Sequence, residues 1–181
     1  MKIPILITAI IRVVLLAPLV LSAGVGEETE SILRQVFPGA DGFEFTAIEL
    51  DLTAKKQAER ASGQAFQMEK VFLWQIRDGA DIIGFAVLDN VLGKVQPITY
   101  LAVYDSQLSI VEVQVIRYRE QHGGAVQNLS WLDQFKGFAS DSGFMLGEHI
   151  DGITGATLSA NALTRGVKRM TVYLSLTVQT N

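Results

Sequence analysis

The chain has 181 residues, of which 49% are apolar and 19% charged, and its formal net charge is −4. This length and apolar content suffice for one hydrophobic core plus an accessory segment, without disulfides or metal ions to stabilise the fold. The sequence contains no cysteine, which excludes disulfides, thiolate zinc sites, Cys-ligated iron–sulfur clusters and a catalytic thiol. The acidic balance also argues against nucleic acid as a partner, because affinity for nucleic acid rests on clustered Lys and Arg.

The chain begins with an apolar run, residues 3–21, which follows Lys2 and ends in the small residues Ser22-Ala23-Gly24. This pattern is typical of a secretory signal peptide, and its length also suits an uncleaved membrane anchor. Arg12 inside the run makes a stable membrane span costly and favours the cleaved form. In both cases we expect residues 1–23 to place the protein outside the cytoplasm, in the periplasm or on the outer face of the cytoplasmic membrane.

Residues 24–66 are predicted to form a helical and mixed segment. The apolar spacing favours a short amphipathic helix at 30–36, loose alternation favours a strand at 43–50, and residues 52–66 are rich in helix-forming Ala, Lys, Gln and Glu. We assign no function to this segment.

Residues 67–181 are predicted to be the main domain, and its first half consists of strands. The ranges 71–76, 82–88, 98–104 and 108–118 have strand patterns, with tight turns at 78–81 and 105–107, and residues 89–97 are predicted to be a loop. The alternation of Val111, Val113 and Val115 with polar residues indicates a sheet with one buried face. We therefore expect a single α+β domain in which helices pack on an antiparallel sheet.

Two glycines follow the last predicted strand, in the run Tyr118-Arg-Glu120-Gln-His-Gly123-Gly124. Adjacent glycines allow backbone conformations closed to other residues and permit the close approach of a flat ligand. A plain loop leaving a strand is the alternative interpretation. A short helix with Trp131 and Phe135 is predicted at 130–136.

The C-terminal helix is preceded by a turn of small residues, Asp151-Gly-Ile-Thr154-Gly155-Ala156-Thr157. The helix is predicted to begin around Ser159, because apolar residues at spacings of three and four follow it. A Thr157 hydroxyl there lies beside unpaired backbone N–H groups, a place that favours a phosphate, although the simpler interpretation is that Thr157 or Ser159 caps the helix. The cations farther along the helix are interpreted as ordinary ones that suit the helix dipole; these are Arg165, Lys168 and Arg169.

The turn resembles the Asp-x-x-Ser/Thr-Gly-Ala-Thr motif of FMN-binding domains, which include flavin-carrying subunits of the sodium-pumping NADH:quinone reductase and of the Rnf complex. Residues 118–124 and 131–135 resemble two further elements of the family, Tyr-Arg-Glu-x-x-Gly-Gly and Trp-x-x-Gln-Phe. The resemblance implies a covalent FMN, joined through its phosphate to Thr157 by a FAD:protein FMN transferase. It also implies cofactor-site roles for seven other residues: Asp151, which is thought to serve the transferase; Thr154, Gly155 and Ala156 in the turn; and Glu120, Gly123 and Gly124, which line the flavin site or orient the turn.

The resemblance implies an extracytoplasmic electron carrier that exchanges electrons with membrane redox donor or acceptor proteins. Two alternatives remain open: a flavin-dependent reductase with its own small-molecule acceptor, and a non-redox binding module. We assign no catalytic residues. We also expect no metal site, because the acidic and histidine residues at 141–151 lack a recognised ligand spacing.

Overall fold

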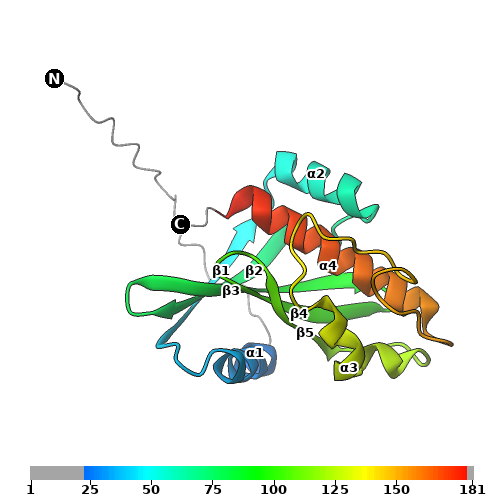
Figure 1. Cartoon of the computed structure of the whole chain (residues 1–181), viewed down its shortest axis with the longest axis horizontal. Helices are drawn as coiled ribbons and strands as arrows, with labels where there is room; N and C mark the ends of the chain where they lie inside the picture. The colour runs from blue at the N-terminus through cyan, green and yellow to red at the C-terminus, as the bar shows by residue number, and fades with distance from the viewer. Residues whose placement is uncertain (1–22, 179–181) are drawn as a thin grey trace.

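The computed structural model describes residues 23–178, so residues 1–22, which are all but the last residue of the predicted signal peptide or anchor, lie outside the described part. A five-stranded antiparallel sheet forms the centre, with each strand beside its neighbour in sequence, and helices cover both of its faces (Figure 1). The predicted α+β fold is confirmed.

The strands are β1 (Gly42–Glu49), β2 (Lys70–Asp78), β3 (Asp81–Leu92), β4 (Pro97–Asp105) and β5 (Ile110–Arg117). The helices are α1 (Ala23–Val36), α2 (Leu52–Ser62), α3 (Leu129–Leu132) and α4 (Thr157–Thr177), with short 3-10 helices η1 (Gly124–Gln127) and η2 (Asp133–Phe135) around α3.

The register of the strands sorts the apolar residues into two cores, one on each face. Paired positions keep the same face across an antiparallel sheet, because side chains alternate along each strand. The row Leu73, Val87, Ala102 and Val113 faces the core that holds α4. The neighbouring row, which includes Trp74, faces a smaller core under α1.

Helices α4 and α2 lie on one side of the sheet and α1 on the other (Figure 1). Helix α4 buries Leu163, Val167 and Met170 in the larger core, as the spacing in the sequence predicts. Asp51 caps the start of helix α2, because its carboxylate accepts hydrogen bonds from the N–H groups of Thr53 and Ala54. The Asp51 N–H in turn donates to Tyr173 Oη at 3.1 Å, which ties the start of α2 to the end of α4.

The prediction of a loop at residues 89–97 is wrong for most of these residues. Strand β3 continues to Leu92 and pairs there with Pro97, so the connection to β4 is only the turn 93–96. Pro97 is the first residue of β4, the position in a strand where a missing N–H is tolerated. The turn is closed by Gly93 N–H donating to Gln96 O at 3.0 Å.

Several predicted helix boundaries also change. Helix α1 starts earlier than residue 30, α2 stops at Ser62, and the helix expected at 130–136 is a single α-helical turn followed by 3-10 helix. Helix α4 continues to Thr177 through the β-branched residues near its end, because burial of one helical face outweighs their weak preference against helix. Within residues 23–178, no helix combines the length and the apolar character that a membrane span requires.

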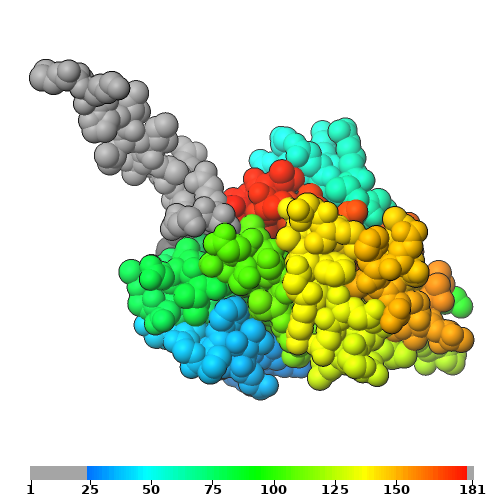
Figure 2. Space-filling model, in the orientation of Figure 1, coloured from blue at the N-terminus to red at the C-terminus, as the bar shows by residue number. Residues whose placement is uncertain are grey.

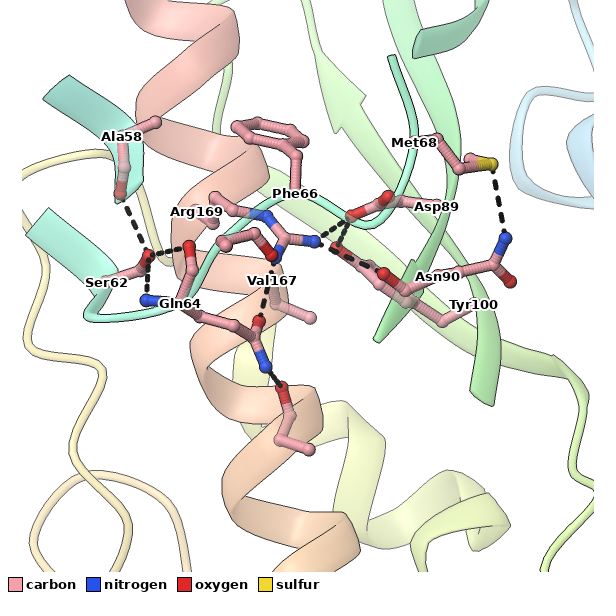
Figure 3. A network of polar contacts seen from close by, with 12 residues as sticks. Ala58, Ser62, Gln64, Phe66, Met68, Asp89, Asn90, Tyr100, Val167 and Arg169 are labelled. Atoms are coloured by element: carbon pink, nitrogen blue, oxygen red, sulfur yellow. Dashed lines mark hydrogen bonds and ion pairs between the residues drawn. The ribbon is translucent and has the colours of Figure 1, made fainter. Parts of the chain in front are cut away.

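The interpretation of Arg169 as an ordinary helix cation is wrong. Its side chain is 0% exposed, and its Nη2 lies 2.6 Å from Asp89 Oδ2 on β3. Figure 3 shows the guanidinium between β3 and the segment after α2, where it also donates to Gln64 Oε1 and to the Ala65 carbonyl. The guanidinium stacks on the ring of Phe66, and Arg169 Cζ is 4.4 Å from the ring centroid. This network joins α4, β3 and the end of the N-terminal segment in one buried cluster.

Candidate functional site

Thr157 is the first residue of α4, and it is exposed. The turn before it is closed by Ala156 N–H, which donates to Ile153 O at 3.0 Å. The hydroxyl of Thr157 points back at the same carbonyl, but the distance of 3.4 Å makes this a weak bond. Because the first N–H groups of a helix have no acceptor within it, the hydroxyl lies at a site that attracts an anion.

Gly155 has a φ of 79° and is exposed, two residues before Thr157. Residues with a Cβ rarely adopt this left-handed conformation, so the turn requires glycine here. Ala156 is buried under the turn and serves as the N-cap without a side-chain hydrogen bond. The small residues therefore leave the hydroxyl of Thr157 uncrowded.

The helix does not begin at Ser159, and Ser159 does not cap it. Its side chain is 4% exposed, and its Oγ lies 3.0 Å from the hydroxyl of Tyr118, which donates to His122 O at 2.5 Å. Gly123, with a φ of 86°, lies against this contact: a Cβ there would be 2.8 Å from Tyr118 Oη. Tyr118 thus connects the first turn of α4 to the double-glycine loop.

Asp151, the first residue of the turn motif, is held through its backbone by the short helices α3 and η2. Trp131 Nε1 donates to Asp151 O at 2.8 Å, and Asp151 N–H donates to Gln134 Oε1 at 2.9 Å. The carboxylate of Asp151 is left exposed. Trp131 is 7% exposed and packs edge-on against Phe135, so a fixed side chain in the core holds the first residue of the turn motif. In the space-filling view, the segment from α3 to the start of α4, yellow to orange, forms a continuous part of the surface (Figure 2).

An open cavity of about 630 Å³ lies beside Thr157. Three stretches of chain line it: residues 94–96 of the turn 93–96, residues 119–123 after β5, and residues 155–159. Five of the predicted site residues are therefore brought to one cavity: Glu120, Gly123, Gly155, Ala156 and Thr157. The other three, Asp151, Thr154 and Gly124, are outside its lining, and Asp151 and Thr154 are exposed on the approach to Thr157.

Glu120 lines the cavity and is hydrogen-bonded to another part of its wall. Its Oε1 accepts hydrogen bonds from Val95 N–H at 2.6 Å and Gln96 N–H at 3.0 Å, so it holds the turn 93–96 rather than the turn before α4. These two N–H groups lower the pKa of the Glu120 carboxyl from its ordinary value, and the nearby Lys94 adds to the effect.

The cavity lining combines charged and apolar groups, and Glu120 is its acidic residue. Lys94 and Arg119 contribute positive charge, and the Arg119 guanidinium donates to Pro97 O and to Thr99 Oγ1 at 3.2 and 3.1 Å. Val95 and Leu158 are 66% and 58% exposed, so two apolar side chains of the lining are open to solvent. The volume is within the range of about 300–1,000 Å³ of small-ligand sites. The cationic side chains suit an anionic group such as a phosphate, and Val95 and Leu158 offer apolar contacts to a flat ring.

Residues 93–172 match the family model described as the FMN-binding domain. By this match, this part of the chain is an FMN-binding domain. The match begins at the turn 93–96 and ends within α4, so it includes all three stretches that line the cavity. An FMN-binding domain implies FMN as the cofactor, which has a phosphate and a flat ring system.

A solved structure supports the same fold. The chain resembles the crystal structure of Shewanella oneidensis NqrC with a TM-score of 0.55 and 16% sequence identity, over 81% of this chain and 88% of that one. At this identity the likeness concerns the fold. The likeness covers more of the chain than the 80 residues of the family match, so it also includes residues that precede residue 93. No curated protein matches the chain.

Sequence reasoning missed part of this site. Tyr118 and Gln134 stand inside the motifs that carry the resemblance, but nothing in their spacing shows that one contacts Ser159 and the other Asp151. The predicted loop at 89–97 also did not distinguish the turn 93–96 from the strand residues on either side of it. Within residues 23–178, no group of three or more Asp, Glu and His side chains is placed to hold a metal ion.

Proposed function

We propose that the chain is an extracytoplasmic electron-transfer flavoprotein that carries FMN in phosphoester linkage to Thr157. The observation that carries the proposal is the position of Thr157: its exposed hydroxyl stands at the start of α4, on the wall of a cavity that also has Lys94 and Arg119 in its lining. Family membership supplies the cofactor, and the anion-binding end of the helix supplies a place for its phosphate.

A threonine hydroxyl is a poor nucleophile at its normal pKa, so attachment needs an outside enzyme. In the proposed step, Thr157 Oγ1 attacks the FMN phosphorus of FAD, an Oγ1–P bond forms, the P–O bond to the AMP half breaks, and AMP leaves. The hydroxyl proton passes to a base of the transferase. The exposed Asp151 and the uncrowded turn give the transferase access to Thr157.

The bound isoalloxazine supplies the redox chemistry by accepting and releasing one or two electrons. The chain's own part is to orient the ring in the cavity, to surround it with the charges of Lys94 and Arg119, and to keep it from diffusing away. The resemblance in fold to NqrC, together with the expected N-terminal signal or anchor, supports membrane redox proteins as electron donors or acceptors.

The attachment is tested by expressing the full chain with a FAD:protein FMN transferase and examining it under denaturing conditions. We expect flavin fluorescence in the denatured band and an intact mass increased by one phosphoester-linked FMN. Both are lost in Thr157→Ala and partly retained in Thr157→Ser. The matched control is Thr46→Ala, an exposed threonine on β1. Fluorescence that persists in Thr157→Ala, or that disappears only in Thr154→Ala, would contradict Thr157 as the attachment site.

The location and the role as a carrier need separate measurements. A reporter enzyme that is active only outside the cytoplasm, fused after Asn181, should be active when residues 1–23 are present and inactive when they are deleted. Loaded protein should exchange electrons with membranes that contain a quinone-linked dehydrogenase. Specific turnover of a small-molecule acceptor by the purified protein alone would instead favour a reductase.

A further inference from the structure

The turn 93–96 contributes three residues to the cavity, yet it is a short connection at the end of a long hairpin. Lys94, Val95 and Gln96 are all exposed, so packing does little to fix them. Backbone hydrogen bonding within the turn is limited to one bond, from Gly93 N–H to Gln96 O. Something else must hold this part of the cavity wall in place.

The contacts of Glu120 supply that restraint. One carboxylate oxygen accepts from both Val95 N–H and Gln96 N–H, at 2.6 and 3.0 Å. Bonds from N–H groups to a carboxylate are stronger than those between neutral groups. Glu120 belongs to the stretch after β5, so these bonds join two of the three stretches that line the cavity.

Gly93 provides the space for this contact. A Cβ at position 93 would lie 2.7 Å from Glu120 Oε1, 3.2 Å from Gln96 O and 3.2 Å from Ile98 Cδ1. The severe overlap is with the end of the flexible Glu120 side chain, which can move away. An alanine at position 93 would therefore displace the carboxylate from the turn and leave the hairpin folded.

We propose that Glu120 is a positioning residue which, with Gly93, clamps the turn 93–96 and so sets one wall of the cavity beside Thr157. The part of the inference that concerns bound flavin rests on the proposed function above. The clamp keeps Lys94 and Val95 in the lining, where one presents a charge and the other an apolar surface to the occupant. Glu120 acts through the turn and needs no contact with the flavin itself.

The clamp is tested first in the full chain without flavin, by NMR measurement of amide hydrogen exchange at Val95 and Gln96. Exchange should be faster by roughly tenfold or more in Glu120→Ala and in Gly93→Ala, because the protecting acceptor is gone in both. Glu120→Gln keeps an acceptor oxygen without the charge and should fall between wild type and Glu120→Ala. The controls are Gly39→Ala, where nothing lies within 4 Å of the added Cβ, and Glu49→Ala, an exposed carboxylate on β1. Exchange rates that match wild type in both clamp variants would overturn the proposal.

The second measurement uses the same variants loaded by the transferase. Iodide quenching of the flavin fluorescence should rise severalfold, and the midpoint potential should shift in the same direction in Glu120→Ala and Gly93→Ala. Fast exchange combined with unchanged quenching and potential would show that the turn is no wall of the flavin site, which also overturns the proposal. If the wild-type chain carries no covalent flavin, the proposed function fails together with the role of the clamp toward flavin, whereas the exchange rates still decide whether the clamp exists.

Discussion

Arg169 on α4 and Asp89 on β3 form a fully buried ion pair, with side chains 0% and 2% exposed and 2.6 Å between Nη2 and Oδ2. The same carboxylate oxygen accepts a hydrogen bond from Tyr100 Oη at 2.9 Å. Burial raises the pKa of Tyr100 well above its ordinary value, and the negative charge of Asp89 adds to this. The pair therefore fixes α4, the helix that begins with Thr157, to the centre of the sheet (Figure 3).

Removal of one partner of this pair should destabilise the protein strongly. Asp89→Ala leaves an unpaired buried guanidinium and Arg169→Met an unpaired carboxylate, and each should lower the free energy of unfolding by about 3–5 kcal/mol. The double variant should lose less than the sum of the two, because neither charge is then left alone. Denaturant unfolding monitored by circular dichroism measures the effect. Glu30→Ala, which breaks the exposed pair with Arg34 at 3.9 Å, is the control and should change stability by less than about 1 kcal/mol. A similarly small loss in Asp89→Ala would contradict the prediction.

Tyr118 and Ser159 should be energetically coupled, because their hydroxyls are 3.0 Å apart and Ser159 is buried. A double-mutant cycle with Tyr118→Phe and Ser159→Ala should give a coupling free energy of about 0.5–1.5 kcal/mol in unfolding experiments. The control cycle pairs Tyr118→Phe with Ser175→Ala, an exposed serine on the same helix whose hydroxyl donates to Val172 O. Additive effects in both cycles would mean that the double-glycine loop and α4 are not linked by this bond.

The support of Asp151 by α3 and η2 should affect the rate of flavin attachment. Trp131→Phe removes the Nε1 donor and Gln134→Ala removes the acceptor, so the backbone of Asp151 loses one bond in each. A lost bond is worth about 0.5–1.5 kcal/mol, so the initial rate of FMN incorporation by the transferase should fall severalfold. Gln134→Glu keeps the accepting oxygen and should remain near the wild-type rate. A fall of equal size in Gln134→Glu and Gln134→Ala would show that the bond to Asp151 does not matter for attachment.

The clamp at Glu120 should weaken in acid. Its folded-state pKa is lowered, first by the N–H groups of Val95 and Gln96 and also by the charge of Lys94. A lowered pKa means that the stabilisation of the turn is complete above the ordinary value of 4.5 and is lost as the pH falls through the folded-state pKa. Protection of the Val95 and Gln96 amides, corrected for intrinsic exchange, should therefore be constant from neutral pH to about pH 5 and decrease below it. Glu120→Gln has no carboxyl at this position and should show no such decrease; a parallel decrease in that variant would assign the effect to another group.

The sequence specified the sheet and the main helix well because their signals are local. Alternation of apolar residues around Val113 identified β5, and spacings of three and four from Ala160 identified the buried face of α4. Boundaries were less well predicted. Gly93 and Pro97 suggested a long loop, although Gly93 is the first residue of a four-residue turn and Pro97 the first residue of the strand that follows it. Whether such residues end a strand or only limit its pairing depends on the neighbouring strand, which the local pattern does not describe.

By itself, the sequence determined the chemistry available to this protein: no thiol, a phosphate-attracting Thr157 within a turn of small residues, and motifs that resemble those of FMN-binding domains. Only the tertiary structure decided which residues act together. In the structure, the turn 93–96, Glu120 and Thr157 line one cavity. Ser159 makes a buried contact with Tyr118 and does not cap the helix. Arg169 is buried in an ion pair and is not a surface cation. The reason is physical: side-chain identity and spacing determine local propensity and burial, whereas contacts between residues 25 to 80 positions apart depend on how the strands and helices pack.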